Sequence, residues 1–326
     1  MWDFKKYGSK VAAICDTGES ITYQQLDIAG KNLIDKTIGR CLVFSLCTNS
    51  IGSVVGYTGF MNHDIVPLLL DSHLDNELMD YLIRLYKPSY LWVPNSMAER
   101  FDQYHQIYED MNYILLETKF MDVYPLYDEL GLLLTTSGST GSPKLVRQSY
   151  KNVEANMKSI VDYLGLDETE RPITTLPMSY TYGLSIINSH LSVGATLLLT
   201  DKTLMEKGFW SFFKDQKATS FGGVPYTYEI LDKLKFFKME LSSLRTMTQA
   251  GGKLSPELHK KFAEYAIDNN KHFVVMYGQT EATARMSYLP YEKSLEKYGS
   301  MGIAIPGGKF ALIDTDGNVI TSPEIV

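Results

Sequence analysis

Residues 132–150, LLLTTSGSTGSPKLVRQSY, are the stretch from which the fold can be worked out. An apolar run leads into residues 136–144, where hydroxyl side chains, two glycines and a lysine cluster, and a helical pattern begins after Ser149. Glycines permit backbone conformations in which successive N–H groups face an anion, and the Ser, Thr and Lys side chains add donors and positive charge. The segment therefore predicts a phosphate-binding loop between a strand and a helix.

Two other interpretations of this loop stay open from its residues alone. Its spacing does not fit GxxxxGK[ST], so a conventional P-loop phosphotransferase, which would form ADP, is disfavoured. Ser and Gly also cluster in ordinary polar connections between strands and helices, which makes a plain linking loop the second alternative.

Short apolar runs alternate with amphipathic segments on both sides of the loop. Continuously apolar or β-branched runs are typical of strands covered on both faces, and the predicted strands are 41–47, 65–70, 90–93, 113–116, 132–136, 196–199, 244–248 and 273–277. Helical spacing predicts helices over 76–86, 152–164, 225–236 and 256–266, with Ser255 as the N-cap of the last. The repeated β–α order predicts an α/β fold with parallel or mixed sheets flanked by helices.

The pattern changes near the end of the sequence. Residues 310–314 and 319–321 flank Asp316-Gly317, which predicts a hairpin. The sequence then stops at Val326 on an apolar stretch, so we expect the chain to end inside a β-structure.

Composition excludes several classes of protein. The 326 residues are 44% hydrophobic and 21% charged, which is typical of a soluble globular chain and not of a fibrous or disordered one. The 31 basic and 38 acidic residues give a net charge of −7, which argues against a general nucleic-acid or anionic-membrane binder. No run approaches the roughly 18 apolar residues of a membrane span. We therefore expect a cytoplasmic protein with no nucleic-acid partner and no membrane span.

Cysteines and histidines give no sign of a disulfide framework or a transition-metal site. The three cysteines contain no CxxC pair, and the six histidines contain no HExxH motif. This usage suits a reducing cytosol and predicts no catalytic zinc or iron.

The loop TTSGSTGSPKLV resembles the signature loop of the adenylate-forming superfamily, which includes acyl-CoA synthetases, peptide-synthetase adenylation domains and luciferases. Six further segments resemble motifs of that superfamily in the same order, so chance is a poor explanation. They are 21–26 (ITYQQL), 59–71 (GFMNHDIVPLLLD), 176–184 (LPMSYTYGL), 250–258 (AGGKLSPEL), 277–281 (YGQTE) and 299–307 (GSMGIAIPG).

The resemblance covers nearly the whole chain and implies a layered large N-terminal AMP-binding domain over 1–326. Lobe one would be about 40–171, lobe two about 1–39 plus 172–295, and a small β-subdomain would start over about 296–326. The superfamily's ribose-binding acid, hinge and catalytic lysine would lie beyond Val326. We therefore expect this chain to lack the C-terminal lid domain, which the full-length protein would supply.

The resemblance also implies a reaction. A small-molecule carboxylic acid attacks the α-phosphate of ATP, pyrophosphate leaves, and the acyl-adenylate passes its acyl group to a thiol of CoA or of an acyl-carrier protein. ATP and Mg²⁺ would be the cofactors of such an AMP-forming acid–thiol ligase, and the isolated chain would be incomplete. The alternative is a non-catalytic nucleotide-binding or partner-binding module that keeps the fold.

Residue roles follow from the matched motifs. Thr280, Glu281 and Lys144 are the expected catalytic residues, and Glu281 would hold Mg²⁺, a cation that prefers oxygen ligands. Tyr277 would stack on adenine; the alternative is an ordinary core aromatic residue at a strand end. For Glu281 taken alone, the alternative is an ordinary solvated glutamate. The residues expected to bind the nucleotide are Thr136, Ser137, Gly138, Ser139, Thr140, Gly141, Lys144, Gly251, Gly252, Lys253, Tyr277, Gly278, Gln279 and Thr280.

The sequence departs from the superfamily around the expected acid pocket. Tyr180 stands where relatives often have His, and Tyr150 replaces another frequent His. Residues 180–183 offer no carboxylate for a substrate ammonium group, which disfavours an α-amino acid and favours a simple carboxylic acid. The predicted pocket residues are Tyr180, Tyr182, Gly183, Phe221, Gly223, Val224, Pro225 and Met286.

Overall fold

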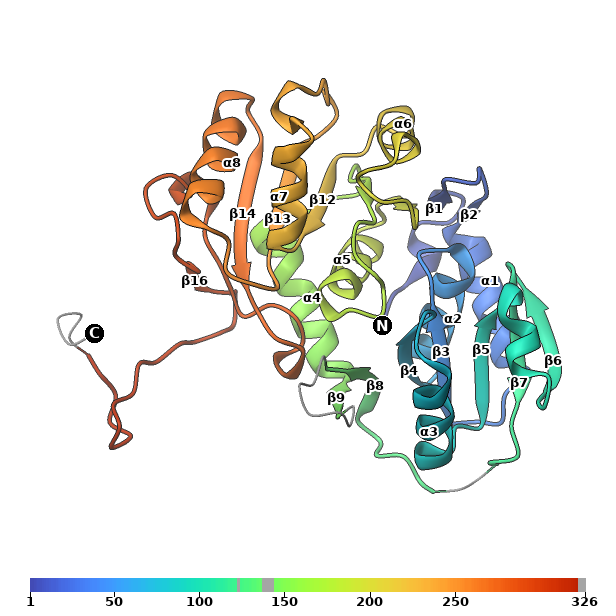
Figure 1. Ribbon diagram of the computed structural model, residues 1–326. Helices are drawn as coiled ribbons and strands as arrows, with labels where there is room; N and C mark the ends of the chain where they lie inside the picture. Colours follow the sequence, from blue (N-terminus) through green and yellow to red (C-terminus); the bar gives the residue numbers. More distant parts are fainter. Residues whose placement is uncertain (122–123, 137–143, 322–326) are drawn as a thin grey trace.

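The computed structural model describes residues 1–121, 124–136 and 144–321, which form two β-sheets with helices packed against their faces (Figure 1). Both sheets contain mainly parallel strands with antiparallel strands at their edges. The predicted α/β fold of layered parallel or mixed sheets is confirmed.

The seven-stranded sheet has the order β6-β7-β5-β3-β4-β8-β9. Its central strands β5, β3, β4 and β8 are parallel, whereas β6, β7 and β9 pair with their neighbours in antiparallel register. The strands are β3 (Leu42–Cys47), β4 (Val66–Asp71), β5 (Tyr90–Pro94), β6 (His105–Asp110), β7 (Tyr113–Glu117), β8 (Leu130–Thr135) and β9 (Leu145–Ser149).

The nine-stranded sheet has the order β16-β15-β14-β13-β12-β10-β11-β1-β2. Its six strands from β14 to β1 are parallel. The strands are β1 (Val11–Cys15), β2 (Ser20–Thr22), β10 (Pro172–Ile173), β11 (Leu197–Leu199), β12 (Ser220–Gly223), β13 (Thr246–Gln249), β14 (His272–Tyr277), β15 (Ser287–Tyr288) and β16 (Ile303–Ala304).

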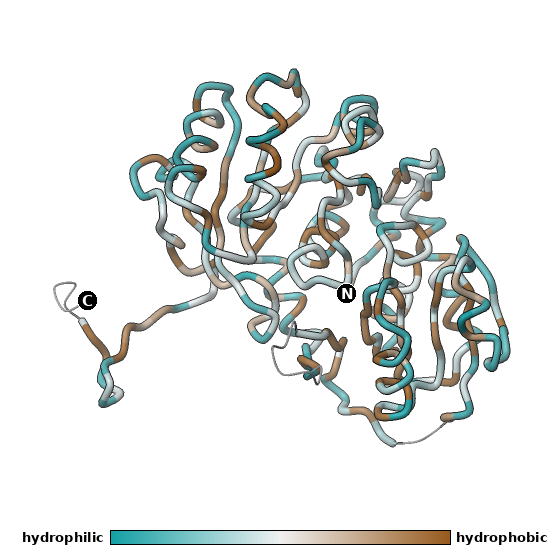
Figure 2. The backbone as a smooth tube through the Cα atoms, viewed as in Figure 1, coloured by the Kyte–Doolittle hydropathy of each residue, from teal (hydrophilic) through white to brown (hydrophobic). Residues whose placement is uncertain are grey.

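The helices complete a layered structure, and the hydrophobic residues concentrate in the strands and in the helix faces between the layers (Figure 2). Between the sheets lie α1 (Tyr23–Ile34), α2 (Ile51–Asn62), α4 (Tyr150–Leu164) and α5 (Thr181–Ser192). The outer faces carry α3 (Asn76–Tyr86) on one sheet, and α6 (Lys207–Asp215), α7 (Pro225–Lys233) and α8 (Pro256–Asp268) on the other. Short 3₁₀ helices are η1 (Phe4–Lys6), η2 (Asn95–Phe101), η3 (Phe236–Lys238), η4 (Thr280–Ala282) and η5 (Tyr291–Lys293).

Most of the predicted elements are present, with ends shifted by a few residues. Helix α3 has the predicted bounds because Asp75 caps it by accepting hydrogen bonds from the first-turn N–H groups. Helix α8 begins as predicted, with Ser255 accepting from the backbone N–H of Leu258 at 3.2 Å. Helix α7 stops at Lys233, short of the predicted end at 236, because Lys235 takes a left-handed conformation with φ of +59°.

The phosphate-loop prediction needs one correction. The segment joins two antiparallel strands rather than a strand and a helix, since β9 pairs with β8 from Leu145 opposite Thr135 to Ser149 opposite Leu130. Helix α4 follows β9, with Ser149 as its N-cap. The short stretch LVRQS has too little alternation to be predicted as a strand.

The predicted C-terminal hairpin is only partly right. The turn is present, with Gly317 at φ of +87°, but the flanking strands at 310–314 and 319–321 are reduced to one antiparallel bridge between Ile313 and Val319. Both residues are more than 60% exposed, so no packed layer supports longer strands here.

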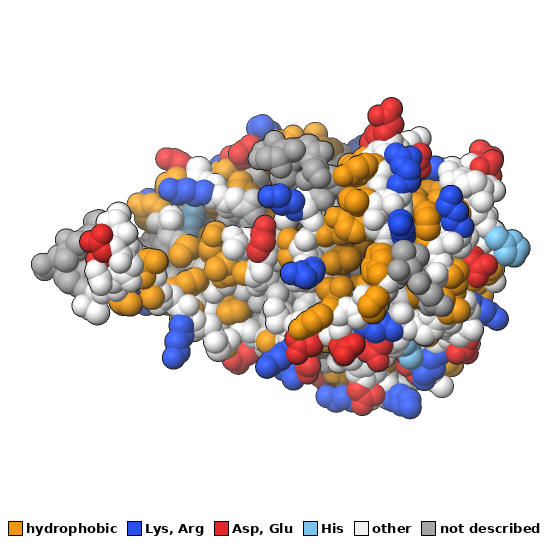
Figure 3. Space-filling model, turned by 90° about the horizontal axis from the view of Figure 1, so that it is seen from below, with side chains coloured by type: hydrophobic (Ala, Val, Ile, Leu, Met, Phe, Trp, Pro, Cys, Tyr) orange, Lys and Arg blue, Asp and Glu red, His pale blue; other side chains and the backbone are white. Residues whose placement is uncertain are grey.

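The molecular surface has hydrophobic regions as well as charged ones. After β16 the chain leaves the body of the molecule (Figure 1), and Leu312 there is 56% exposed. Figure 3, viewed from below, shows hydrophobic side chains gathered across the middle of that face. In the described part of the chain no helix combines the length and apolar composition needed to cross a membrane.

Candidate functional site

The predicted nucleotide-binding segments meet at one edge of the nine-stranded sheet. Strands β13 and β14 are parallel neighbours, with Gln249 opposite Val275, so the segments that follow their carboxyl ends lie side by side. These segments are 250–254 and 277–281, which carry the AGGKL and YGQTE motifs.

The hairpin that carries the predicted phosphate loop is tethered to the same edge. Gln148 of β9 is 2% exposed, and its Nε2 donates a hydrogen bond of 2.9 Å to the carbonyl oxygen of Thr280. At the end of the hairpin, the N–H of Thr136 donates to the carbonyl of Lys144 at 3.4 Å, and Lys144 is exposed. The structure therefore ties β9 to η4 through Gln148 and pairs the two ends of the loop with each other. The predicted residues Ser137, Gly138, Ser139, Thr140 and Gly141 lie outside the described residues.

The glycines after β13 form the contact between the nucleotide segments and the predicted acid pocket. Gly251 has φ of +79°, a conformation that glycine adopts without strain. A Cβ atom at Gly251 would lie 2.5 Å from the hydroxyl of Tyr180, and one at Gly252 would lie 3.0 Å from the ring of Pro225. Gly251, Gly252 and Lys253 are all exposed, so their backbone is accessible to a ligand.

The YGQTE segment turns sharply after β14. Tyr277 is 41% exposed at the end of the strand, and the N–H of Met286 donates to its carbonyl at 2.8 Å. A Cβ atom at Gly278 would lie 1.6 Å from the carbonyl oxygen of Ala284, so only glycine fits where this loop folds back on itself. Gln279, at the N-cap position of η4, is exposed.

Glu281 offers a carboxylate that no group of the described residues binds. It is exposed on η4 and makes no hydrogen bond or ion pair with a described residue. Within the described ranges no three His, Cys, Asp or Glu residues are grouped to hold a metal. Mg²⁺ needs few protein carboxylates when phosphate oxygens complete its shell, so a single free Glu281 fits a magnesium–nucleotide complex.

Three of the eight predicted acid-pocket residues gather on the inner face of the nine-stranded sheet. Tyr180, Tyr182 and Val224 pack in one apolar cluster with Ala250 and Met276. Tyr182 is 3% exposed, and its hydroxyl forms a 2.8 Å hydrogen bond with Thr248 Oγ1. Burial raises the pKa of Tyr182, so its phenol stays neutral. Aromatic side chains thus make up much of the wall of the predicted pocket.

The remaining predicted pocket residues have other surroundings. Phe221 packs on the opposite face of the sheet, with its ring 6.3 Å from that of Tyr228, and is not brought together with the others. Gly183 lets α5 approach the preceding turn, since a Cβ there would lie 2.4 Å from the carbonyl of Pro177. Gly223 ends β12, Pro225 is in the first turn of α7, and half-buried Met286 precedes β15.

A cavity of about 470 Å³ escaped the sequence prediction. It lies beyond the carboxyl ends of β3 and β4 in one sheet and of β10 and β11 in the other, and its lining includes Cys47, Asp71, Thr174, Met178 and Thr200. Ligands favour the carboxyl ends of parallel strands, so the strand predictions contained a usable signal for it. The cavity also contacts residues 176–178, at the start of the LPMSYTYGL segment.

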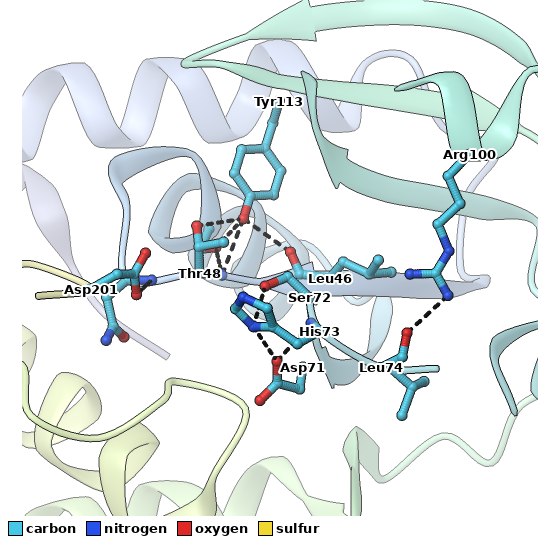
Figure 4. A network of polar contacts seen from close by, with 11 residues as sticks. Leu46, Thr48, Asp71, Ser72, His73, Leu74, Arg100, Tyr113 and Asp201 are labelled. Atoms are coloured by element: carbon cyan, nitrogen blue, oxygen red, sulfur yellow. Dashed lines mark hydrogen bonds and ion pairs between the residues drawn. The ribbon is translucent and has the colours of Figure 1, made fainter. Parts of the chain in front are cut away.

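Polar contacts fix the rim of this cavity (Figure 4). Tyr113 is 2% exposed, and its hydroxyl lies 3.0 Å from Thr48 Oγ1 and donates to the carbonyl of Leu46 at 2.9 Å. Burial raises the pKa of Tyr113 to about 12. The backbone N–H of Asn49 donates to Asp201 Oδ1 at 3.0 Å. Since Asn49 follows β3 and Asp201 follows β11, this bond links the two sheets beside the cavity.

Comparisons with known proteins give a family and a fold. The family model described as AMP-binding enzyme matches residues 2–324. The peroxisomal OPC-8:0-CoA ligase 1 of Arabidopsis thaliana is 31% identical over 207 residues, which are 60% of this chain and 36% of that protein. The 2-succinylbenzoate–CoA ligase of Oceanobacillus iheyensis is 27% identical over 202 residues, which are 62% of this chain and 40% of that protein. The chain thus spans less than half the length of these relatives.

Solved structures resemble the whole chain. The N-terminal domain of FACL13 from Mycobacterium tuberculosis superimposes with a TM-score of 0.80 at 18% identity, covering 97% of this chain and 83% of that one. The o-succinylbenzoate coenzyme A synthetase of Bacillus subtilis in complex with ATP and magnesium ion gives a TM-score of 0.77 at 20% identity, covering 97% and 66%. These likenesses show the fold.

Proposed function

Because the chain belongs to the AMP-binding enzyme family, as its motifs predicted, we propose that it binds magnesium–ATP and a carboxylic acid and joins them as an acyl-adenylate with release of pyrophosphate. The observation that carries the proposal is the hydrogen bond from Gln148 to the carbonyl of Thr280. It ties β9, the strand that follows the predicted phosphate loop, to the segment that presents Glu281, which supports a shared role of the two segments.

Each segment would have one task in this reaction. The exposed ring of Tyr277 would pack on the base, opposite the accessible backbone of Gly251 and Gly252. Lys144 would supply positive charge to the phosphates, and Glu281 would hold the magnesium ion. Magnesium bound with ATP neutralises phosphate charge and so lets the anionic carboxylate approach. The protein's contribution is to align the acid with the α-phosphate.

The acyl group would then pass to a thiol. We assign the cavity of about 470 Å³ to the thiol of CoA or of an acyl-carrier protein, because its size suits a ligand and it borders residues 176–178 on the way to Tyr180. The two sheets would be the two lobes, about 40–171 and about 1–39 plus 172–295, and residues from about 296 would begin a β-subdomain. A lid domain in the full-length protein would complete the site, and the buried thiols of all three cysteines suit a cytoplasmic location.

The reaction is tested by acid-dependent exchange of labelled pyrophosphate into ATP, with the full-length protein and a panel of aliphatic, aromatic and amino acids. Exchange with at least one acid is expected, because the first half-reaction is reversible. An absence of exchange with every acid would contradict the proposal.

The nucleotide site is tested separately by calorimetry of magnesium–ATP binding. Glu281→Ala and Tyr277→Ala should each weaken binding at least tenfold. Glu99→Ala is the matched control, since it removes an exposed glutamate from η2, and it should bind ATP as the unmodified protein does. Unchanged affinity in both site variants would show that the nucleotide lies elsewhere.

A further inference from the structure

Arg285 is a buried cation beside the predicted acid pocket. It is 2% exposed and lies four residues after Glu281, between η4 and β15. Its guanidinium lies 5.1 Å from the centre of the Tyr182 ring, and its Nε donates to Ser185 Oγ at 3.2 Å. Tyr182 and Ser185 both belong to α5, whose first turn contains the last residues of the LPMSYTYGL motif.

The partners that this guanidinium has among the described residues are all neutral. Nη1 donates to the hydroxyl of Tyr163 at 3.0 Å and to the thioether sulfur of Met276 at 3.3 Å, and a thioether is a weak acceptor. Nη2 has no hydrogen-bond partner among the described residues. His190 of α5 is buried, and burial, with a smaller contribution from Arg285, lowers its pKa to about 4, so its ring stays neutral as well.

A buried arginine without a carboxylate is unfavourable for the protein alone. Charged side chains that leave water are ordinarily paired, because desolvation must be offset by an opposite charge. No acidic residue forms an ion pair with Arg285 in the described part of the chain. The free Nη2 together with a neighbouring nitrogen forms the planar fork that binds a carboxylate through two hydrogen bonds. A ligand carboxylate would therefore supply the negative charge that no described residue provides for Arg285.

The position of Arg285 indicates which carboxylate this would be. The nucleotide segments at Gly251 and Tyr277 are exposed, whereas Arg285 is buried behind Tyr182. The carboxylate that reacts must stay at the exposed end, next to ATP. The group that reaches Arg285 is then at the other end of the acid.

We propose that Arg285 selects acids that carry a second carboxylate, so that the preferred substrates are small dicarboxylic acids. The inference rests on the proposed function and adds a substrate class to it. The distal carboxylate would take two hydrogen bonds from the guanidinium, replacing the weak contact with Met276. The unbranched side chain of Met276 can change rotamer to admit the ligand.

The test compares acids of equal length in the pyrophosphate exchange assay with the full-length protein. The pairs are succinate with butyrate, glutarate with pentanoate and adipate with hexanoate. At least one dicarboxylate should have a kcat/KM tenfold or more above that of its matched monocarboxylate. Arg285→Met, which keeps most of the volume and removes the charge, should reduce exchange with that dicarboxylate a hundredfold or more and change the monocarboxylate less than threefold. Its Tm should not fall, because no buried counter-charge is left behind.

Three outcomes would overturn the inference. One is a preference of the unmodified protein for monocarboxylates in every pair. That result would leave the proposed adenylation intact and contradict only the claim that the substrate carries a second carboxylate. Another is an equal loss for all acids in Arg285→Met, which would place the guanidinium at the reacting carboxylate or in a purely structural role. The third is a selectivity between dicarboxylates and monocarboxylates that Arg285→Met leaves unchanged.

If Arg285→Met does not fold, Arg285→Lys, which keeps the charge without the fork, should lose the dicarboxylate preference. Absence of exchange with any acid would instead contradict the proposed function itself.

Discussion

Mild acid should destabilise this protein through a histidine that the fold holds neutral. His259 of α8 is 1% exposed, and its Nδ1 accepts a hydrogen bond of 3.1 Å from the N–H of Gly299. The ring proton is then on Nε2, which lies 3.1 Å from the hydroxyl of Ser294 and donates to it. A second proton, on Nδ1, would point at the Gly299 N–H and remove this hydrogen bond. Burial lowers the pKa of His259 to about 4.

The sign and size of the effect follow from linkage. A histidine whose pKa is lowered by folding binds its proton more readily in the unfolded chain, so stability is complete above pH about 6.5 and falls as the pH drops toward about 4. Between pH 8 and pH 5 the loss is about 2 kcal/mol for this single group. His190, whose pKa is also lowered to about 4 by burial, adds a loss of about the same size.

Urea unfolding followed by circular dichroism at pH 8 and pH 5 measures this loss. In His259→Gln the amide can still accept from Gly299 and donate to Ser294 but cannot titrate, so the loss between the two pH values should shrink by about 2 kcal/mol. His105→Gln, at an exposed position of β6, should keep the full pH dependence. If His259→Gln loses as much stability on acidification as the unmodified protein, the reasoning is refuted.

Two other substitutions and one chemical modification have expected results that follow from the surroundings of a single residue. Gly278→Ala should reduce ATP affinity tenfold or more in calorimetry, because its Cβ would lie 1.6 Å from the carbonyl oxygen of Ala284 and displace the loop. Tyr182→Phe should lower the urea unfolding free energy by about 1 kcal/mol, because it removes the hydrogen bond to Thr248. Cys47, whose thiol pKa burial raises to about 12, should resist iodoacetamide at pH 8 in the native protein and react in urea, as mass spectrometry would show.

Elements whose residues carry a simple pattern were predictable from the sequence. Strands β3, β4 and β14 are continuously apolar because both of their faces are covered, and all three were found. Helix α2 was missed although it too is continuously buried. Eleven of its twelve residues are buried, so it shows no amphipathic period. Its glycines allow close packing, since a Cβ at Gly56 would lie 2.3 Å from Trp92 Nε1.

The sequence motifs predicted which segments form the candidate site, but not the contacts that join these segments in space. The motifs at 250–258 and 277–281 placed the candidate ligand-binding loops after β13 and β14. The link from Gln148 to Thr280 joins residues 132 positions apart, and no local pattern encodes it. Arg285 was missed because a lone arginine in a sequence is most often a surface residue, and only the fold reveals that it is buried without a carboxylate.

The segment 176–184 lies between the two candidate ligand sites, and its sequence explains how they stay apart. Leu176 and Met178 line the cavity at the carboxyl ends of the strands, whereas Tyr182, further along the same segment, is buried against Thr248 on the path to Arg285. In the proposed reaction the acid would occupy the side of Tyr182 and the thiol the side of Met178. On that proposal the acyl group would be transferred near Tyr180, which is half-buried and lies against Gly251. A phenol at that position would close the pocket by packing and would bring no charge to a place where, in the proposed reaction, two anions meet.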